Sequence, residues 1–168
     1  MKALLAALAV LLLPLSVLAE GFAVTDLTTL SDADLSGFEG GEFVAASDDP
    51  NRLSILCPSC AGFTAIDIIL GQAWDDSEDR LRAGTTDFAK LEELCKNNNP
   101  TCTMEPVSVG RAVGWASVYQ LGEGVGSTSV LFLDGGMLTI RSLGPSEETT
   151  LANAAAAREG IGLRIVGE

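Results

Sequence analysis

The sequence predicts an α+β domain in which two helices pack on an antiparallel β-sheet, with the elements in the order β-β-α-β-β-β-β-α-β. Three observations indicate this class. Several short segments alternate apolar and polar residues, as strands with one buried face do. Short turns join neighbouring strands, which favours antiparallel pairing. Two longer segments place apolar residues at helical spacing between capping and stopping residues.

Residues 1–19 are predicted to be a secretory signal peptide. Lys2 gives the positive start, an apolar run extends from Ala3 to Leu18, and Ala19 supplies a small residue at the signal-peptidase site. The run is short for a membrane-spanning helix and Pro14 interrupts it, which favours cleavage over retention as an anchor. We therefore expect a periplasmic or secreted protein with no stable membrane span after signal cleavage.

Residues 20–50 are predicted to be an acidic linker rich in Gly, Ser and Asp. The segment is polar, and Ser31 is a candidate cap for one short helix within it. Gly40 and Gly41 are typical of a flexible segment. The folded domain is then expected to occupy residues 51–168.

The first half of the domain predicts two strands and a helix. The strands cover Leu53–Leu56 and Phe63–Leu70, and an acidic loop follows over Trp74–Arg80. The helix covers Thr86–Lys96, with its first or second residue as the cap. The asparagine run and Pro100 then stop it, because proline cannot continue a helix.

The second half begins with a meander of four predicted strands: Thr103–Val109, Ala112–Leu121, Ser127–Leu133 and Met137–Leu143. Pro106 lacks a backbone N–H and therefore places the first of these at an edge of the sheet. The last two strands flank Asp134, Gly135 and Gly136. This is a strong hairpin signal, because Asp-Gly tolerates positive φ angles.

The chain is predicted to end with a helix and a strand. Ser146 can cap the helix, and the two glutamates that follow favour its positive end. The alanine-rich helix is expected to end at Gly160. Ile161, Leu163 and Ile165 alternate with other residues and predict a final strand.

The order of elements from Leu53 to Val166 resembles that of the PsbP-like α/β/α-sandwich domains of exported bacterial and plastid proteins. The shared features are a helix after an early strand pair, a long meander and a C-terminal helix. The resemblance implies an α/β/α sandwich that acts as a binding or assembly factor without catalytic residues. It carries no functional residue over to this sequence.

Four cysteines, Cys57, Cys60, Cys95 and Cys102, form an even set, and export to an oxidising compartment favours two disulfides. Three pairings are possible. Chain entropy favours crossed pairing, because a longer loop constrains the unfolded chain more strongly. We prefer the local pairs, Cys57 with Cys60 and Cys95 with Cys102, because cysteines close in sequence meet first during oxidation.

The Cys57-Pro58-Ser59-Cys60 motif supports an alternative function. It follows an apolar strand, as the active site of thioredoxin-type proteins does, so Cys57 would be the nucleophile and Cys60 the resolving thiol of a thiol–disulfide oxidoreductase. Such a site needs a helix that starts at the first cysteine and lowers its thiol pKa. The β-branched run after Phe63 predicts a strand instead, which favours a structural disulfide.

Composition excludes several kinds of chemistry. The chain has 168 residues, a net charge of −13 and no histidine, which excludes Ser-His-Asp catalysis, Cys-His catalysis and histidine metal sites. The acidic balance argues against nucleic-acid binding. A four-cysteine zinc site is disfavoured because Cys95 and Cys102 lack a short C-x2-C spacing. We therefore predict no metal and no cofactor.

Trp74, Trp115 and Tyr119 are the large aromatic residues that carry a polar atom. Trp115 and Tyr119 are predicted to share one strand face, which favours core packing over a binding surface. No set of residues matches a catalytic pattern. The leading interpretation is therefore an exported, non-catalytic acidic domain. It would be a binding or accessory/assembly module of the cell envelope, with an unknown protein or small-molecule partner.

Overall fold

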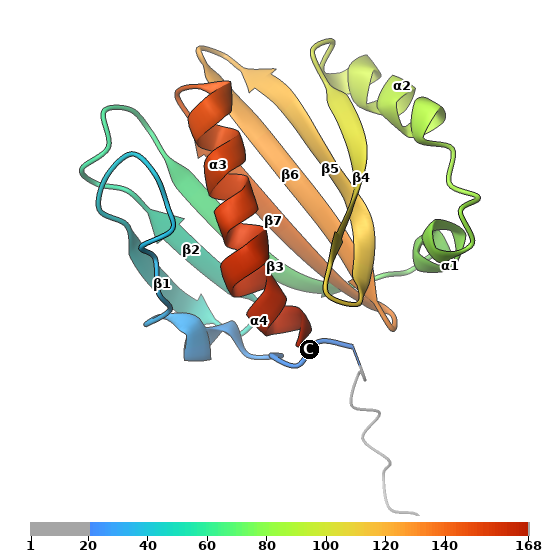
Figure 1. Cartoon of the computed structure of the whole chain (residues 1–168), viewed down its shortest axis with the longest axis horizontal. Coiled ribbons are helices and arrows are strands. Elements are labelled where there is room, and N and C mark those ends of the chain that lie inside the picture. The colour runs from blue at the N-terminus through green and yellow to red at the C-terminus, as the bar shows by residue number, and fades with distance from the viewer. Residues whose placement is uncertain (1–20, 168) are drawn as a thin grey trace, which may run out of the picture.

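A computed structural model describes residues 21–167, so the predicted signal peptide over residues 1–19 lies outside the described part. Seven strands form one sheet: β1 (Val44–Asp49), β2 (Arg52–Leu56), β3 (Ala65–Gln72), β4 (Thr103–Val109), β5 (Ala112–Leu121), β6 (Gly124–Leu133) and β7 (Gly136–Gly144). All neighbours pair antiparallel in the order β1-β2-β3-β7-β6-β5-β4 (Figure 1). The predicted α+β class with an antiparallel sheet is confirmed.

The helical elements are η1 (Leu27–Leu30), α1 (Ser77–Arg82), α2 (Phe88–Asn98), α3 (Glu147–Ala157), η2 (Arg158–Gly162) and α4 (Leu163–Val166). The last three follow one another without a break and cross one face of the sheet, while α1 and α2 lie on the side of β4 and β5 (Figure 1). The main elements therefore run β-β-β-α-α-β-β-β-β-α. This corrects the predicted order, which lacked β1 and α1 and ended in a strand.

The two sets of helices cover opposite faces of the sheet. Arg158, which follows α3, donates a hydrogen bond to Ser129 Oγ at 3.1 Å. Trp115 lies beside α1 and α2. Ser129 pairs with Ala116 across β5 and β6, and because side chains alternate along a strand, Trp115 points to the other face. The helices α1 and α2 contact chiefly β4, β5 and β6, so they cover only part of their face.

The core lies between the sheet and the C-terminal helix. The sheet contributes fully buried aliphatic side chains from four strands: Leu53, Ile55, Ile66, Ile68, Leu131, Leu138 and Ile140. The helix contributes Ala157, Ile161 and Ile165. Burying apolar surface is the main favourable term in folding. This core therefore stabilises the sheet, although the opposite face of the sheet is partly open.

The segment predicted as a linker over residues 20–50 instead packs onto the domain in its described part, from residue 21 onwards. Leu27 and Leu30 have no exposed surface, and both lie on one side of the 3-10 turn η1 because they are three residues apart. Phe38 and Phe43 also pack against the core. The linker prediction was wrong because it rested on the polar composition of the whole segment. A few apolar residues in it are spaced so that they reach the core together.

The predicted final strand is also wrong. A π-helical turn over Arg158–Gly162 carries the helix past Gly160 and into α4. Ile161 and Ile165 are buried, whereas Leu163 between them is 40% exposed. Residues spaced by four fit one face of a helix as well as one face of a strand, so alternation alone could not separate the two structures.

Several local predictions are confirmed. The strands β4 and β5 have the predicted bounds. Asp134 and Gly135 turn the β6–β7 hairpin with φ angles of 49° and 82°. Ser146 caps α3 by accepting a hydrogen bond from the Thr149 amide at 3.2 Å. The acidic loop over Trp74–Arg80 is a loop only at its start, because α1 begins at Ser77.

Candidate binding site

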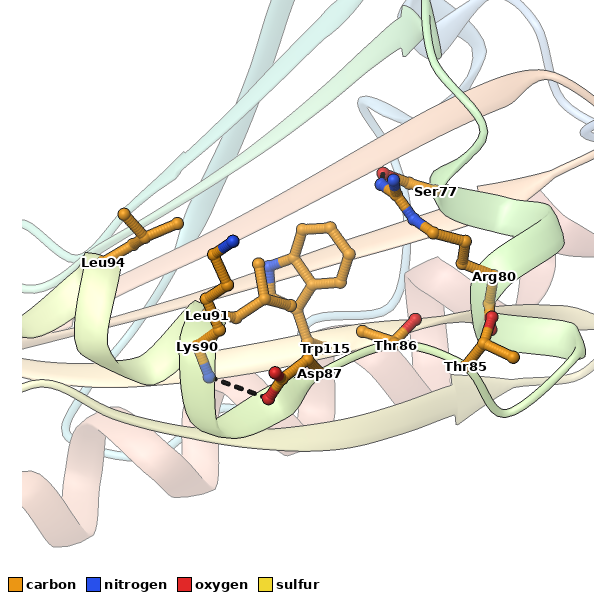
Figure 2. Close-up of a pocket in the computed structure, with 9 residues that line it drawn as sticks. All are labelled: Ser77, Arg80, Thr85, Thr86, Asp87, Lys90, Leu91, Leu94 and Trp115. Atoms are coloured by element: carbon orange, nitrogen blue, oxygen red, sulfur yellow. Dashed lines mark hydrogen bonds between the residues drawn. The ribbon is translucent and has the colours of Figure 1, made fainter.

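A cavity of about 360 Å³ lies between α1, α2 and the sheet (Figure 2). Trp115 rises from β5 at its centre. Lys90, Leu91 and Leu94 line it from α2, and Arg80 lines it from the end of α1. Ligand pockets have volumes of about 300–1,000 Å³ and combine apolar walls with a few polar groups, so this cavity has the size and lining of a small-molecule site.

Helix α2 is unusual because none of its residues is buried. Leu94 on its cavity side is 52% exposed. The helix is held by a few polar and covalent links instead. Asp87 caps its start by accepting from the Lys90 amide at 3.0 Å. Glu92 accepts from the Met104 amide of β4 at 3.3 Å, and the Cys95–Cys102 disulfide ties the end of the helix to the start of β4. Most helices in proteins are stabilised by packing of an apolar face. Helix α2 does not pack in this way, and the cavity lies between it and Trp115 of β5.

Trp115 forms a fixed floor for this cavity. Its ring lies 5.2 Å from the ring of Phe132, centroid to centroid, with the planes tilted by 49°. Phe132 is only 4% exposed. Tilted aromatic pairs at this distance are favourable beyond their buried area. The indole is therefore held from below and presents its other side to the cavity.

The cavity offers two cations and a free hydroxyl. One carboxylate, that of Asp87, also lines it and already accepts a hydrogen bond from the Lys90 amide (Figure 2). The Lys90 ammonium makes no ion pair with any of residues 21–167. Arg80 is bound to Asp76 at 2.8 Å and donates to Ser77 Oγ at 3.2 Å. Thr86 Oγ1 is buried and has no hydrogen-bond partner in the described structure. Buried polar groups are nearly always paired, so this hydroxyl is available to a ligand.

Glu78 positions α1, and with it one wall of the cavity. Its carboxylate accepts hydrogen bonds from the amides of Asp134 and Gly135 at 3.0 and 3.1 Å, and it pairs with Arg82 at 2.8 Å. Partial burial acts to raise the pKa of Glu78. The Gly135 amide, Arg82 and the Asp134 amide outweigh burial, so the pKa lies below its usual value.

Replacing this carboxylate should therefore weaken the fold in a pH-dependent way. A lowered folded-state pKa stabilises the protein above the usual glutamate pKa, and this contribution is lost as the pH falls through the folded-state value. Glu78→Gln is expected to cost about 1–2 kcal/mol of unfolding free energy at pH 7. The difference from the parent protein should shrink below the usual glutamate pKa. Urea unfolding at pH 7 and at a pH below the usual glutamate pKa tests this. An equal loss of unfolding free energy at the two pH values would contradict it.

The four cysteines form the two local pairs that we preferred. Cys57 pairs with Cys60 and Cys95 with Cys102, with Cα–Cα distances of 5.5 and 5.8 Å. No free cysteine is present in the described structure. Disulfides of this kind are typical of proteins in oxidising, extracytoplasmic compartments.

The surroundings of the Cys57–Cys60 disulfide are those of a structural link. Strand β2 ends at Leu56, turns follow, and β3 starts at Ala65, so in the described chain no helix begins at Cys57. Cys57 is 8% exposed. The backbone of Gly41 passes directly over the disulfide, where a Cβ atom would lie 2.9 Å from Cys57 Sγ.

A side chain at Gly41 should therefore disrupt the packing of this backbone segment on the Cys57–Cys60 disulfide. The added Cβ would also lie 2.7 Å from Ser59 Oγ, closer than such atoms approach. We expect Gly41→Ala to destabilise the fold by about 1–3 kcal/mol, as overpacking does. The control is Gly37→Ala, because its nearest neighbour would be 3.8 Å away. Thermal unfolding of the two variants tests this, and equal melting temperatures would contradict a close contact at Gly41.

The predicted aromatic residues are distributed differently from our expectation. Trp115 and Tyr119 do share one face of β5, but this is the partly open face, and both are half-buried. Trp115 lines the cavity, and Tyr119 lines a second hollow farther along the strand. Trp74 is 89% exposed. The sequence did not indicate a role for Lys90, since only the folded chain shows that α2 stands above Trp115.

Comparison with known proteins gives no relative: no protein-family model matches the chain, and no curated protein shows significant similarity to it. The resemblance to PsbP-like domains therefore stays a prediction. Among residues 21–167, no helix has the length and apolar character needed to cross a bilayer. In the same part of the chain, no three His, Cys, Asp or Glu residues lie close enough to form a metal site.

Proposed function

We propose that the protein is an exported, non-catalytic binding module of the cell envelope and that its ligand occupies the cavity beneath α2. The observation that carries this proposal is a helix that buries none of its own residues yet stands over a fixed indole. An unfilled apolar surface of this kind is unfavourable in an isolated domain. A ligand that fills the cavity would cover Trp115, Leu91 and Leu94 together.

The lining favours an organic anion with a flat aromatic part. The flat part would stack on Trp115, while the anionic group would meet the unpaired Lys90 ammonium and the Thr86 hydroxyl. Arg80 would contribute less, because Asp76 already neutralises it. Charged hydrogen bonds are roughly twice as strong as neutral ones, so the anion would set the orientation of the ligand.

The proposed compartment rests on two observations. The two disulfides are typical of an oxidising environment, and residues 1–19 have the pattern of a signal peptide. The alternative function, an oxidoreductase that uses Cys57 and Cys60, has weaker support. Its nucleophile would lack a helix to lower the thiol pKa, and the Gly41 backbone limits access to the sulfur atoms.

Anilinonaphthalene sulfonate is a suitable probe, because it joins an aromatic body to an anion and accepts excitation energy from tryptophan. We expect one dye to bind per native chain and to quench Trp115. Lys90→Gln should weaken binding about tenfold. Arg164→Gln is the matched control. Arg164 is exposed on α4, so its substitution removes the same charge far from the cavity. Unchanged affinity in Lys90→Gln, or no binding to the native chain, would contradict the proposed site.

A further inference from the structure

The partly open face of the sheet carries an apolar row that runs across six strands. Its members are direct cross-strand partners in register: Val44, Leu56, Ala65, Leu143, Gly126 and Tyr119. Val44 is 58% exposed and Leu56 is 50% exposed, although both sit in strands and face the same side. We call these six residues the apolar row.

A polar row runs beside the apolar row, two residues farther along each strand. Its members are again cross-strand partners: Ser54, Asp67, Arg141, Thr128 and Ser117. One side of the face is thus apolar and the adjoining strip is polar. Such a boundary orients a molecule that is apolar along its length and polar at one end.

Arg141 is the cation of the polar row, and it has no acidic partner in the described structure. Asp67 lies directly opposite Arg141 in the register, but other groups occupy its carboxylate. Arg52 binds both oxygens of Asp67 at 2.9 and 3.0 Å, and the Ser54 hydroxyl donates to it at 2.8 Å. The chain has a net charge of −13, yet no carboxylate pairs with this guanidinium in the described structure. Arg141 can therefore bind an anionic ligand.

A hollow of about 270 Å³ joins the two rows at this point. Asp67, Arg141 and Thr128 line it from the polar row, and Ala65, Leu143 and Tyr119 line it from the apolar row. The Asp67 carboxylate is already bound by Arg52 and Ser54, so Arg141 is the charged group left for a ligand. The hydroxyls of Tyr119 and Thr128 lie 3.1 Å apart. One of them therefore has a proton left to donate to an anion in the hollow.

We propose that this hollow binds a carboxylate that carries a linear apolar tail. The Arg141 guanidinium would hold the carboxylate as a fork, a geometry that arginine favours. The tail would lie along the apolar row from Leu143 towards Leu56 and Val44. Three strand spacings separate Leu143 from Val44, a distance of about 14 Å. This is close to the extended length of a dodecanoate tail.

The site differs from the cavity beneath α2, and the inference does not rest on the proposed function. The two sites have no lining residue in common. The exposure of Val44 and Leu56 has an explanation here, because a tail on the apolar row would cover both. Covering exposed apolar side chains is favourable, so the tail would contribute to affinity.

Titration calorimetry with monomeric dodecanoate tests the proposal. We expect one site per chain, with binding about tenfold weaker in Arg141→Gln. Arg164→Gln removes the same charge on the other side of the sheet and should bind as the parent does. Leu56→Ser, at a half-exposed position, should also weaken dodecanoate. Acetate should bind much more weakly than dodecanoate, because it covers none of the apolar row.

Other outcomes overturn the proposal. If Arg141→Gln binds dodecanoate as tightly as the parent protein, the guanidinium does not hold the carboxylate. If dodecyltrimethylammonium binds as tightly as dodecanoate, the site recognises only the tail. If acetate binds equally well, or Leu56→Ser has no effect, the apolar row is not involved. Absence of dodecanoate binding would remove the site altogether.

Discussion

Leu27→Ala is expected to lower the unfolding free energy by about 2–5 kcal/mol, as truncation of a fully buried leucine does. Leu27 has no exposed surface. It packs with Leu30 beneath the edge of the sheet, and its amide donates to Pro50 O at 2.7 Å. The substitution leaves a cavity that the rigid sheet cannot close. Guanidinium unfolding measures the loss directly.

The matched control is Leu121→Ala, because Leu121 is 54% exposed at the end of β5. Removing its side chain takes little apolar surface out of the core, so we expect a change within about 0.5 kcal/mol. If Leu27→Ala costs no more than Leu121→Ala, the segment around η1 is not part of the cooperative fold. The linker interpretation of residues 20–50 would then return.

Replacing both cysteines of the Cys95–Cys102 pair should release α2. The chain-entropy estimate for this small loop is about 2 kcal/mol. We expect a larger local effect, because α2 has no buried residue to hold it when the disulfide is gone. In Cys95→Ser/Cys102→Ala, amides of Phe88–Asn98 should lose protection from hydrogen exchange. The amides of β5 and β6 should keep theirs.

The same variant should lose dye binding in the cavity, since α2 forms one wall of it. Cys57→Ser/Cys60→Ala is the control, because that disulfide lies at the end of β2, away from α2. It is expected to lower stability while leaving the α2 amides protected. Full protection of α2 without the Cys95–Cys102 link would show that packing, and not the disulfide, holds the helix.

The features that the sequence predicted correctly are those that depend on residues close together in the chain. The β6–β7 hairpin follows from the positive φ angles that Asp134 and Gly135 tolerate. Helix α3 starts where Ser146 caps it. Local pairing of the cysteines followed from their spacing, and the structure has these pairs.

The failures lie where tertiary contacts decide the conformation. Leu27 and Leu30 became core residues because the edge of the sheet lies beside them, which no local pattern shows. Ile161 and Ile165 joined a helix because they meet the core from one side. Neither candidate site was visible in the sequence. The cavity requires α2 to stand above Trp115, and the hollow at Arg141 requires the register of three strands.

The central claim is that the two disulfides serve only the structure of this domain, so that it is a binding module and not an oxidoreductase. Equilibration in glutathione buffers, with thiols mapped by mass spectrometry, tests it most directly. We expect both pairs to resist reduction, with potentials below about −300 mV, because Cys57 is buried and the Gly41 backbone covers its sulfur. If Cys57–Cys60 is reduced at about −120 to −270 mV while Cys95–Cys102 survives, the pair is a redox centre and the claim is wrong.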